Sequence, residues 1–365
     1  MMAFSSDTVP QPQNPSKRRG SSDLPCGNFF RRCFKQLWLF TYMVYILTLD
    51  IIEHIFIKAP KIEIEELEKR SEQVAVMTGG PRGIGNDIVK KLLQLDYTVI
   101  LGVRNESTSQ KGIDKIRDLG VTTGRVKFFY LDLKSLESVR EFANKVLDSK
   151  EGSRIDLLLN NAGIFAEGYE KTGDNFESTF QVNYLSHFLL TNLLLPRIKE
   201  TATKNGAGDP CHIVSTSSCL HRCGTIDFEE LETSKVYSPL ECYCLSKLCQ
   251  IIHVKMLDKK FQEEKMNIHA YAVHPGVIVT GLWDDMGGFK CFKRPFNAVM
   301  KWIGRTSDEG ANTILYPLLT PDLLDKAGGH YFETGNVVRP DNQANQPEVQ
   351  QSLWKGSLKL TTSIC

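Results

Sequence analysis

The chain has 365 residues, 41% of them hydrophobic, and a formal net charge of +1 at pH 7. This length and apolar content suffice to bury one large core, so we expect a single α/β domain with short appendages. The balanced charge lacks the basic excess typical of nucleic-acid binding, and we expect no nucleic-acid partner. The 10 cysteines do not resemble a disulfide framework in so long a chain, which predicts buried, reduced thiols.

Two segments precede the domain. Residues 1–28 are polar and rich in proline and basic side chains, which predicts a disordered tail. Residues 29–58 contain an uncharged run at 36–49, shorter than the roughly 20 residues that a spanning helix needs. Trp38 and nearby tyrosines, beside two arginines, favour a membrane anchor segment that lies in the interface or inserts partly. The alternative is an N-terminal helix that packs on the core.

From Ser71 onward, short apolar strands alternate with amphipathic helices. We expect strands at 73–78, 98–103, 126–131, 157–159, 212–216, 268–273 and near 330–332, and helices at 84–95, around 192–198 and at 241–257. Continuous apolar strands between helices imply a parallel sheet covered on both faces. We predict a three-layer, Rossmann-type, doubly wound α/β sheet of about seven strands, forming one domain over residues 71–357.

A glycine-rich turn follows the first strand and opens a helix. Gly79, Gly83 and Gly85 let the backbone turn tightly and approach a pyrophosphate at the N-terminus of the new helix. Their spacing is G-x-x-x-G-x-G rather than the more common G-x-G-x-x-G, and a plain βα loop is the alternative. The strand–turn–helix context favours a dinucleotide-binding turn.

Basic residues near the turn indicate which dinucleotide binds. Arg82 lies inside the turn, and Arg104 follows the second strand, where no acidic residue stands. An acid there would favour a free ribose 2′-hydroxyl, whereas an arginine accommodates a 2′-phosphate. NADP(H) is therefore favoured and NAD(H) remains an alternative. Asp132, at the end of the third strand, is placed to meet the adenine, and small residues at 161–163 allow close packing beside the cofactor.

Tyr243 and Lys247 lie one helical turn apart, on one face of a predicted helix. Free tyrosine has a pKa of about 10, too high for an efficient base at neutral pH, and a neighbouring ammonium favours the phenolate. A serine from the run 215–218 would polarise the substrate oxygen. This set suits oxidation of an alcohol, or reduction of a carbonyl, by a nicotinamide cofactor. Tyr130 and Lys134 share the spacing but straddle a strand end, and a half-buried structural tyrosine is the alternative for Tyr243.

Together these motifs resemble the short-chain dehydrogenase/reductase family over residues 71–357. Within it, the segments 182–191, 243–248 and 271–276 are similar to the retinol-dehydrogenase-like branch, and 237–239 and 307–311 are most similar to one member of that branch. The cofactor-binding residues that the motifs and the resemblance indicate are Gly79, Arg82, Gly83, Ile84, Gly85, Arg104, Asp132, Asn161, Ala162, Gly163, Tyr243, Lys247, Pro275, Gly276 and Thr280.

The resemblance also implies catalytic roles. Tyr243 is the general acid/base, and Lys247 lowers its pKa and holds the nicotinamide ribose. Ser218 orients the substrate oxygen, and Asn183 holds a water of a proton relay. The family's Asn-Val-Ser-Ser phrase reads Ser-Thr-Ser-Ser here, so Ser217 competes with Ser218. Two alternatives to an enzyme stay open. The first is a non-catalytic protein that binds the cofactor as a scaffold or regulator, and the second is a membrane tether.

Residues 278–305 mix apolar and basic side chains, as expected of a lid that touches a membrane and admits a lipid; a lid that packs only on its own domain is the alternative. We expect a lipophilic alcohol or carbonyl substrate: a retinoid, polyprenoid, sterol or fatty aldehyde. No metal is expected, since Cys219, His221 and Cys223 have no second ligand pair at finger-like spacing. Homodimerisation stays open.

Sequence signals disagree on membrane orientation. Residues 1–35 are more basic than 58–72, which for a spanning helix would keep the N-terminus cytosolic and send the domain across. The free cysteines, and the glycosylation sequon that begins at Asn105 beside the cofactor's adenosine end, favour a cytosolic domain. We expect an enzyme associated with the endoplasmic reticulum or lipid droplets, its catalytic domain facing the cytosol.

Overall fold

The structure is a computed structural model of the chain, and it describes residues 25–80, 83–226, 238–278, 304–320, 323 and 331–362. Arg82, Thr280 and most of the expected lid therefore lie outside the described residues. The chain divides into two units, Met1–Thr41 and Tyr42–Cys365, which are described separately. In the first unit the structure describes the beginning of helix α1 (Pro25–Phe56), and the rest of α1 belongs to the second.

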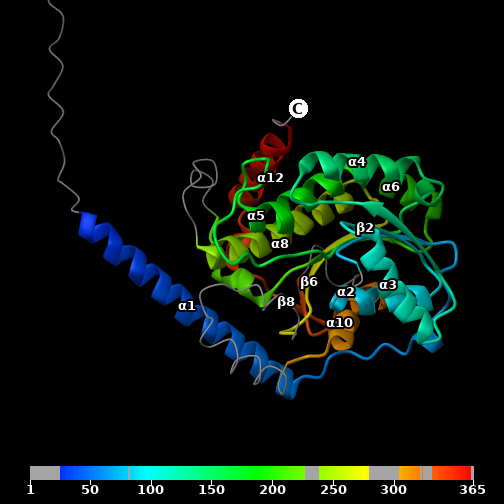
Figure 1. The fold of residues 1–365 in the computed structure, drawn as a ribbon, viewed down its shortest axis with the longest axis horizontal. Coiled ribbons are helices and arrows are strands. Elements are labelled where there is room, and N and C mark those ends of the chain that lie inside the picture. Colours follow the sequence, from blue (N-terminus) through cyan, green and yellow to red (C-terminus); the bar gives the residue numbers. More distant parts are fainter. Residues whose placement is uncertain are drawn as a thin grey trace, which may run out of the picture. The chain divides into compact units, whose positions relative to one another are not determined.

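An eight-stranded sheet forms the centre of the second unit, in the order β3-β2-β1-β4-β5-β6-β7-β8 (Figure 1). The strands are β1 (Val74–Thr78), β2 (Thr98–Val103), β3 (Arg125–Tyr130), β4 (Leu157–Asn160), β5 (Cys211–Thr216), β6 (Ile268–His274), β7 (Tyr331–Glu333) and β8 (Asn336–Val338). All neighbouring pairs are parallel except β7 and β8. The direction of strand addition reverses between β1 and β4, so the carboxyl ends of these strands form the crevice where ligands bind in such sheets.

Helices cover both faces of the sheet (Figure 1). One face carries α4 (Leu136–Asp148), α6 (Ser186–Asn205), α8 (Pro239–Glu263) and α12 (Pro347–Thr362), and the other carries α2 (Ile84–Gln94), α3 (Glu106–Asp118) and α10 (Ser307–Leu319). The short elements are α5 (Ser178–Phe180), the π-helix η3 (Gln181–Leu185) and the 3₁₀ turns η1 (Ile64–Glu66), η2 (Glu151–Ser153), η4 (Cys219–Cys223) and η6 (Asn342–Asn345).

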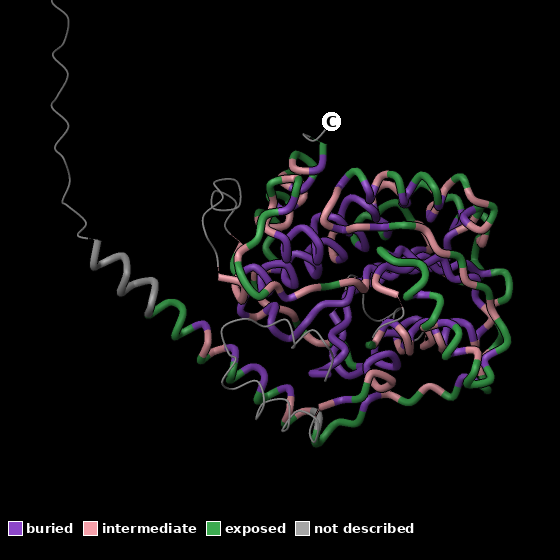
Figure 2. The backbone as a smooth tube through the Cα atoms, viewed as in Figure 1, coloured by how far each residue is buried: buried purple, intermediate pink, exposed green. Residues whose placement is uncertain are grey.

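Alternate strand residues point into two separate cores. Val76 and Leu158 contribute to one core, whereas Met77 and Leu159 contribute to the other. This alternation follows from the pleat of a strand, in which successive side chains leave opposite faces. Figure 2 shows the resulting buried sheet beneath helices whose outer faces are exposed. The predicted three-layer, doubly wound fold is confirmed.

Three differences from the prediction concern the number of strands and the two ends of the described chain. The sheet has eight strands rather than about seven. The extra strand, β8, is three residues long and largely exposed, so no buried apolar run marks it, whereas the equally short β7 is fully buried. Strand β8 turns back antiparallel after Gly335, whose φ of +78° suits glycine. Helix α1 begins at Pro25, inside the segment expected to be a disordered tail. The last helix runs to Thr362, beyond the predicted domain end at 357.

Helix α1 is longer than the predicted apolar run. Residues Phe34–Glu53 are long and apolar enough to cross a membrane by length and composition, with a mean hydropathy of 1.2. The predicted run stopped before Asp50, whereas the helix continues past it. From Tyr42 onward, α1 buries Asp50 together with one apolar face, and it exposes large apolar side chains on the opposite face. The buried apolar residues are Met43, Ile46 and Leu47, and the exposed ones include Tyr45, Leu49, Ile52, Ile55 and Phe56.

Candidate active site

A cavity of about 920 Å³ lies at the carboxyl ends of the strands. The glycine turn after β1 and Arg104 after β2 line it, as do Tyr243 and Lys247 of α8. Of the predicted site residues that the structure describes, all line this cavity except Asn183, whose side chain lies behind it. The fold thus brings together motifs that are spread over most of the domain.

The glycine turn is packed tightly against the loop after β4. A Cβ on Gly79, whose φ is +71°, would lie 2.7 Å from the Ala162 Cα, and a Cβ on Gly85 would lie 2.3 Å from the Gly79 carbonyl oxygen. The N-cap of α2 is Gly83, which has no side chain to satisfy the first N–H groups of the helix. A phosphate group can accept from these donors, so the turn fits a dinucleotide.

Two residues that the sequence analysis missed support this loop. Oγ1 of Thr78 accepts hydrogen bonds from the backbone N–H groups of Asn161 and Ala162, both at 3.1 Å. The same oxygen lies 2.8 Å from Nε2 of His187. Burial lowers the pKa of His187 to about 4, so its ring is neutral at physiological pH. A buried histidine on an apolar helix gives no local signal of this contact, which joins positions 109 residues apart.

Tyr243, Lys247 and Ser218 line the cavity together. Helix α8 begins with a capping box formed by Ser238 and Glu241. The ring of Tyr243 packs on Phe165 with 4.7 Å between centroids, and its hydroxyl is hydrogen-bonded to Ser218. Nζ of Lys247 lies 5.5 Å from the centroid of the Tyr243 ring.

Burial controls the protonation of this group in the free protein. It raises the pKa of Tyr243, and the hydrogen bond with Ser218 opposes that effect only in part. It also lowers the pKa of Lys247 to about 7. Nζ of Lys247 donates to the Thr216 carbonyl oxygen at 2.8 Å, which fixes the amine in the buried site. In the free protein Tyr243 is therefore a protonated phenol, ready to donate a proton.

The two competing serines have different partners. Oγ of Ser217 donates to the backbone carbonyl of Lys247 at 2.9 Å, which attaches the strand end to α8. Oγ of Ser218 accepts from the Leu220 N–H at 3.2 Å and lies against Tyr243. Ser218 is therefore the serine in contact with the tyrosine hydroxyl.

Asn183 joins three segments from within the π-helix η3. Its Oδ1 accepts from the Ile164 N–H at 2.8 Å, and its Nδ2 donates to the Ile164 carbonyl and to Oγ of Ser246. Its backbone carbonyl accepts from Nε2 of Gln250 at 2.7 Å and lies 2.9 Å from Nδ1 of His187. These contacts position the cavity wall, and the role of Asn183 in holding a relay water stays a prediction.

The adenosine end of the cavity is polar. Arg104 is exposed at its rim, and Asp132 lies half-buried beside it, with Oδ1 accepting from the Lys134 N–H at 3.0 Å. Asn105 also lines the cavity and caps α3 by accepting from the Thr108 N–H. A glycan on Asn105 would break that cap and enter the cavity.

The cysteines whose side chains the structure describes are buried thiols, as predicted. The structure describes six free, buried cysteines: Cys211, Cys219, Cys223, Cys242, Cys244 and Cys249. Both ring nitrogens of His221 already have protein partners, the Ser218 carbonyl at 2.7 Å and the Asp341 N–H at 3.1 Å. His221 therefore has no free nitrogen with which to bind a metal between Cys219 and Cys223.

Fold and site together define the class. The chain belongs to the short chain dehydrogenase family, whose model matches residues 73–288, and it is an oxidoreductase of the NAD(P)-dependent alcohol dehydrogenase and carbonyl reductase type. Polyprenol dehydrogenase from Homo sapiens is 33% identical over 293 residues, covering 80% of this chain and 86% of the relative. Retinol dehydrogenase 14 from Mus musculus is 34% identical over 292 residues, covering 77% and 84%.

Solved structures share the fold. A putative uncharacterized protein from Mycobacterium paratuberculosis has a TM-score of 0.63 at 28% identity, covering 83% of this chain and 98% of its own. A short chain dehydrogenase from Burkholderia cenocepacia in complex with NADP has a TM-score of 0.53 at 22% identity, covering 76% and 100%. A 3-oxoacyl-[acyl-carrier protein] reductase from Brucella melitensis in complex with NAD has a TM-score of 0.54 at 24% identity, covering 73% and 96%. Both nicotinamide dinucleotides thus occur on this fold.

Proposed function

We propose that this protein interconverts a lipophilic alcohol and its aldehyde or ketone at a membrane surface, using NADP(H) and Tyr243 as the general acid/base. The observation that carries the proposal is the contact of Tyr243 with Ser218 and Lys247 in a cavity that the glycine turn also lines. The phenol of Tyr243, the hydroxyl of Ser218 and the amine of Lys247 thus line the same cavity as the glycine turn, which is suited to a dinucleotide phosphate.

When bound, the nicotinamide ring supplies or accepts the hydride. In reduction, the Tyr243 hydroxyl donates its proton to the carbonyl oxygen of the substrate, and in oxidation the phenolate takes the proton back. The Ser218 hydroxyl donates a hydrogen bond to the same oxygen and fixes its position. Lys247 is partly protonated near neutral pH because burial lowers its pKa to about 7, and its ammonium form favours the tyrosine phenolate.

The proposal favours NADP(H) over NAD(H). Arg104 stands directly after β2 and lines the cavity, and a guanidinium is well suited to pair with a ribose 2′-phosphate. No acidic residue stands at 101–103, where it would favour a free 2′-hydroxyl.

A lipophilic substrate is supported by the apolar residues that line the cavity: Leu47, Leu133, Ile164, Val182, Val277 and Ile278. The names of the relatives, polyprenol dehydrogenase and retinol dehydrogenase, point to long apolar alcohols. The exposed apolar face of α1 supports attachment to a lipid surface. We place the protein at the endoplasmic reticulum or lipid droplets, with the catalytic domain facing the cytosol.

The decisive experiment replaces Tyr243 with phenylalanine. Turnover of retinol, polyprenol, steroid and fatty aldehyde should be measured with each of NAD(H) and NADP(H), alongside small water-soluble carbonyls. Tyr243→Phe should lower kcat by about 10²- to 10⁴-fold while NADPH binding persists. Tyr130→Phe is the matched control, since Tyr130 has the same lysine spacing but is 53% exposed. Undiminished turnover by Tyr243→Phe would refute the proposed mechanism, and cofactor binding without turnover of any substrate would favour a non-catalytic scaffold.

A further inference from the structure

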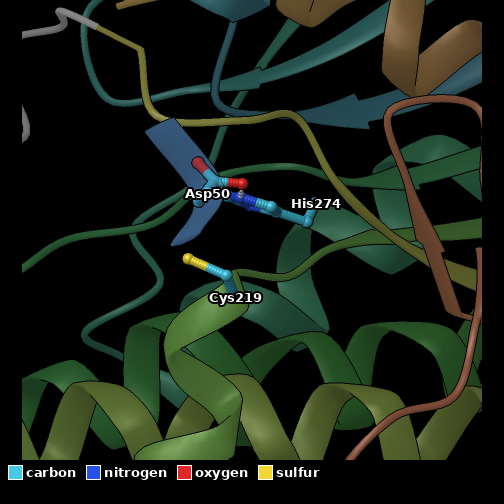
Figure 3. A group of neighbouring side chains, drawn as sticks. All are labelled: Asp50, Cys219 and His274. Atoms are coloured by element: carbon cyan, nitrogen blue, oxygen red, sulfur yellow. Dashed lines mark hydrogen bonds and ion pairs between the residues drawn. The ribbon is translucent and has the colours of Figure 1, made fainter. Parts of the chain in front are cut away.

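A carboxylate from helix α1 reaches the segment that follows β6. Oδ1 of Asp50 lies 3.1 Å from Nε2 of His274, and Oδ2 accepts a hydrogen bond from the Val277 N–H, also at 3.1 Å. Figure 3 shows the Asp50 and His274 side chains pointing at each other, with the Cys219 sulfur directed at the pair. Asp50 and His274 are 8% and 3% exposed, so this contact lies in the interior.

Asp50 and His274 form a buried ion pair. Burial would raise the pKa of Asp50, but His274, with smaller contributions from Arg305 and the Val277 N–H, outweighs that effect and the pKa is lowered. Burial also disfavours the imidazolium, yet Cys219 and Asp50 raise the pKa of His274 well above its ordinary value. Since burial raises the pKa of the Cys219 thiol itself, the charge opposite the imidazolium at neutral pH is the Asp50 carboxylate. A buried carboxylate is costly unless it is paired in this way.

The same three side chains carry oxygen, sulfur and nitrogen atoms that all lie within 4.8 Å of one another. Such a set resembles a zinc site in its donor types. Here, however, both carboxylate oxygens of Asp50 already have protein partners, and the ion pair accounts for its burial. The contacts therefore explain why the Asp50 carboxylate is buried: it is part of a hydrogen-bonded brace.

The braced segment is part of the cavity wall. His274, Pro275, Gly276, Val277 and Ile278 all line the cavity. Gly276 has a φ of +89°, a backbone conformation that side-chain-bearing residues rarely adopt. Such a segment needs external contacts to hold one conformation, because residues 275–278 follow the end of β6 at His274. Asp50 supplies two of those contacts.

The sequence of α1 is arranged for this docking. Met43, Ile46, Leu47 and Asp50 recur at helical spacing and are all buried. Leu47 lines the cavity itself. Asp50 is acidic in an otherwise apolar stretch, where a carboxylate facing lipid would be strongly unfavourable. Residues 42–56 thus belong to the site, although the family model begins at residue 73.

We propose that Asp50 is a positioning residue for the cofactor, and that docking of residues 42–56 through its carboxylate holds the 274–278 segment in the conformation that binds NADP(H). This inference rests on the proposed function, because it assigns a cofactor to that cavity. Asp50 acts through His274 and Val277 rather than on the reacting atoms.

The test uses the full-length chain purified in detergent, with NADPH binding measured by nicotinamide fluorescence. Asp50→Asn removes the charge and should raise the NADPH Kd about 10- to 100-fold. At saturating NADPH, kcat should stay within about twofold of wild type. In hydrogen exchange, the Val277 amide should exchange faster in Asp50→Asn, because its acceptor is weakened.

Glu53→Gln is the matched control. It removes a carboxylate from the same helix, where Glu53 interacts with Thr334 and feels His274 only as a smaller effect of charge, and it should leave the NADPH Kd within about twofold of wild type. Ile46→Ser keeps Asp50 and weakens the docking of the same helical face, so it should also weaken NADPH binding. It provides a second test should Asp50→Asn fail to fold.

The outcomes separate this inference from the proposed function. If the wild type binds NADPH and both Asp50→Asn and Ile46→Ser bind it equally well, this inference is wrong and the proposed function stands. A Kd change that merely matches a loss of folded protein in thermal unfolding would also overturn it. If the wild type binds neither NADPH nor NADH, the proposed function fails and this inference with it. If the purified wild type contains stoichiometric zinc and Asp50→Asn does not, the cluster is a metal site and the proposed brace is wrong.

Discussion

At the scale of single residues, the site depends on two ionisable groups, and burial disfavours the charged form of each. Tyr243 and Lys247 are both buried in α8, and burial raises the pKa of the phenol while it lowers that of the amine. Each shift favours the neutral form, so the free enzyme holds a proton donor beside an amine that is half-protonated near pH 7. A buried amine of this kind makes the stability of the protein depend on pH.

We predict that Lys247→Met stabilises the protein at low pH. Lys247 has a pKa of about 7 when folded and about 10.4 when unfolded. Between about pH 7 and pH 10.4 the unfolded chain holds a proton on Lys247 that the folded chain does not, so the free energy of unfolding rises with pH. Below pH 7 the amine is protonated in both states, and the folded state carries the full cost of a buried ammonium. The stability gained by Lys247→Met should be larger at pH 6 than at pH 10, by on the order of 2–4 kcal/mol.

Urea unfolding of the cofactor-free protein at both pH values measures this difference. Lys259→Met is the control, because Lys259 lies on the same helix with its side chain 73% exposed. An equal change in the free energy of unfolding at pH 6 and pH 10 would contradict the predicted penalty of the buried ammonium.

At the scale of elements, the turn between β1 and α2 requires the backbone at Gly85 to lie very close to the backbone at Gly79 and Gly80. The Gly85 Cα leaves no room for a side chain, because a Cβ would lie 2.3 Å from the Gly79 carbonyl oxygen and 2.7 Å from that of Gly80. Helix α2 can therefore begin directly against the turn, with its N–H groups facing the cavity.

Gly85→Ala should push the start of α2 away from the turn. We expect the free energy of unfolding to fall by about 1–3 kcal/mol and NADPH affinity to fall at least tenfold. Calorimetry and fluorescence titration measure the two effects. Gly173→Ala is the control, since its added Cβ meets no atom within 4 Å. Wild-type affinity in Gly85→Ala would show that the turn does not hold the cofactor.

The local motifs of the site were predictable from the sequence, and its long-range contacts were not. The glycine turn and the pair of Tyr243 and Lys247 have spacings set by one turn or one helix, so a short window reveals them. The partner of His274 lies 224 residues away on α1, and no local pattern links the two. Likewise, β8 was missed because it is short and its residues are mostly exposed, whereas the equally short β7 is a fully buried apolar run.

At the scale of the whole molecule, the N-terminal helix combines two features that its sequence did not separate. Its apolar run predicts a membrane anchor segment, and Phe34–Glu53 is long and apolar enough to cross a membrane by length and composition. From Tyr42 onward the same helix packs Met43, Ile46 and Leu47 into the catalytic unit. Both roles are compatible because a helix can present one face to protein and the other to lipid.

Two truncations should separate these roles. Removal of residues 1–41 takes away the exposed Phe34, Leu37 and Trp38, and it should weaken liposome binding while NADPH binding persists. Removal of residues 1–60 also deletes Asp50 and the buried apolar face, and it should abolish NADPH binding and lower the melting temperature. Liposome sedimentation and thermal unfolding provide the measurements. Equal behaviour of the two truncations would contradict this division of the helix.

The buried thiols of α8 can report how often the structure around the active site opens locally. Cys242, Cys244 and Cys249 flank Tyr243 and Lys247 on one helix and are inaccessible in the closed fold. A maleimide dye can react with them only during transient opening, so the modification rate reports the local opening equilibrium. If NADP⁺ slows the modification, the ratio of the two rates measures how strongly the bound dinucleotide stabilises α8 against local opening.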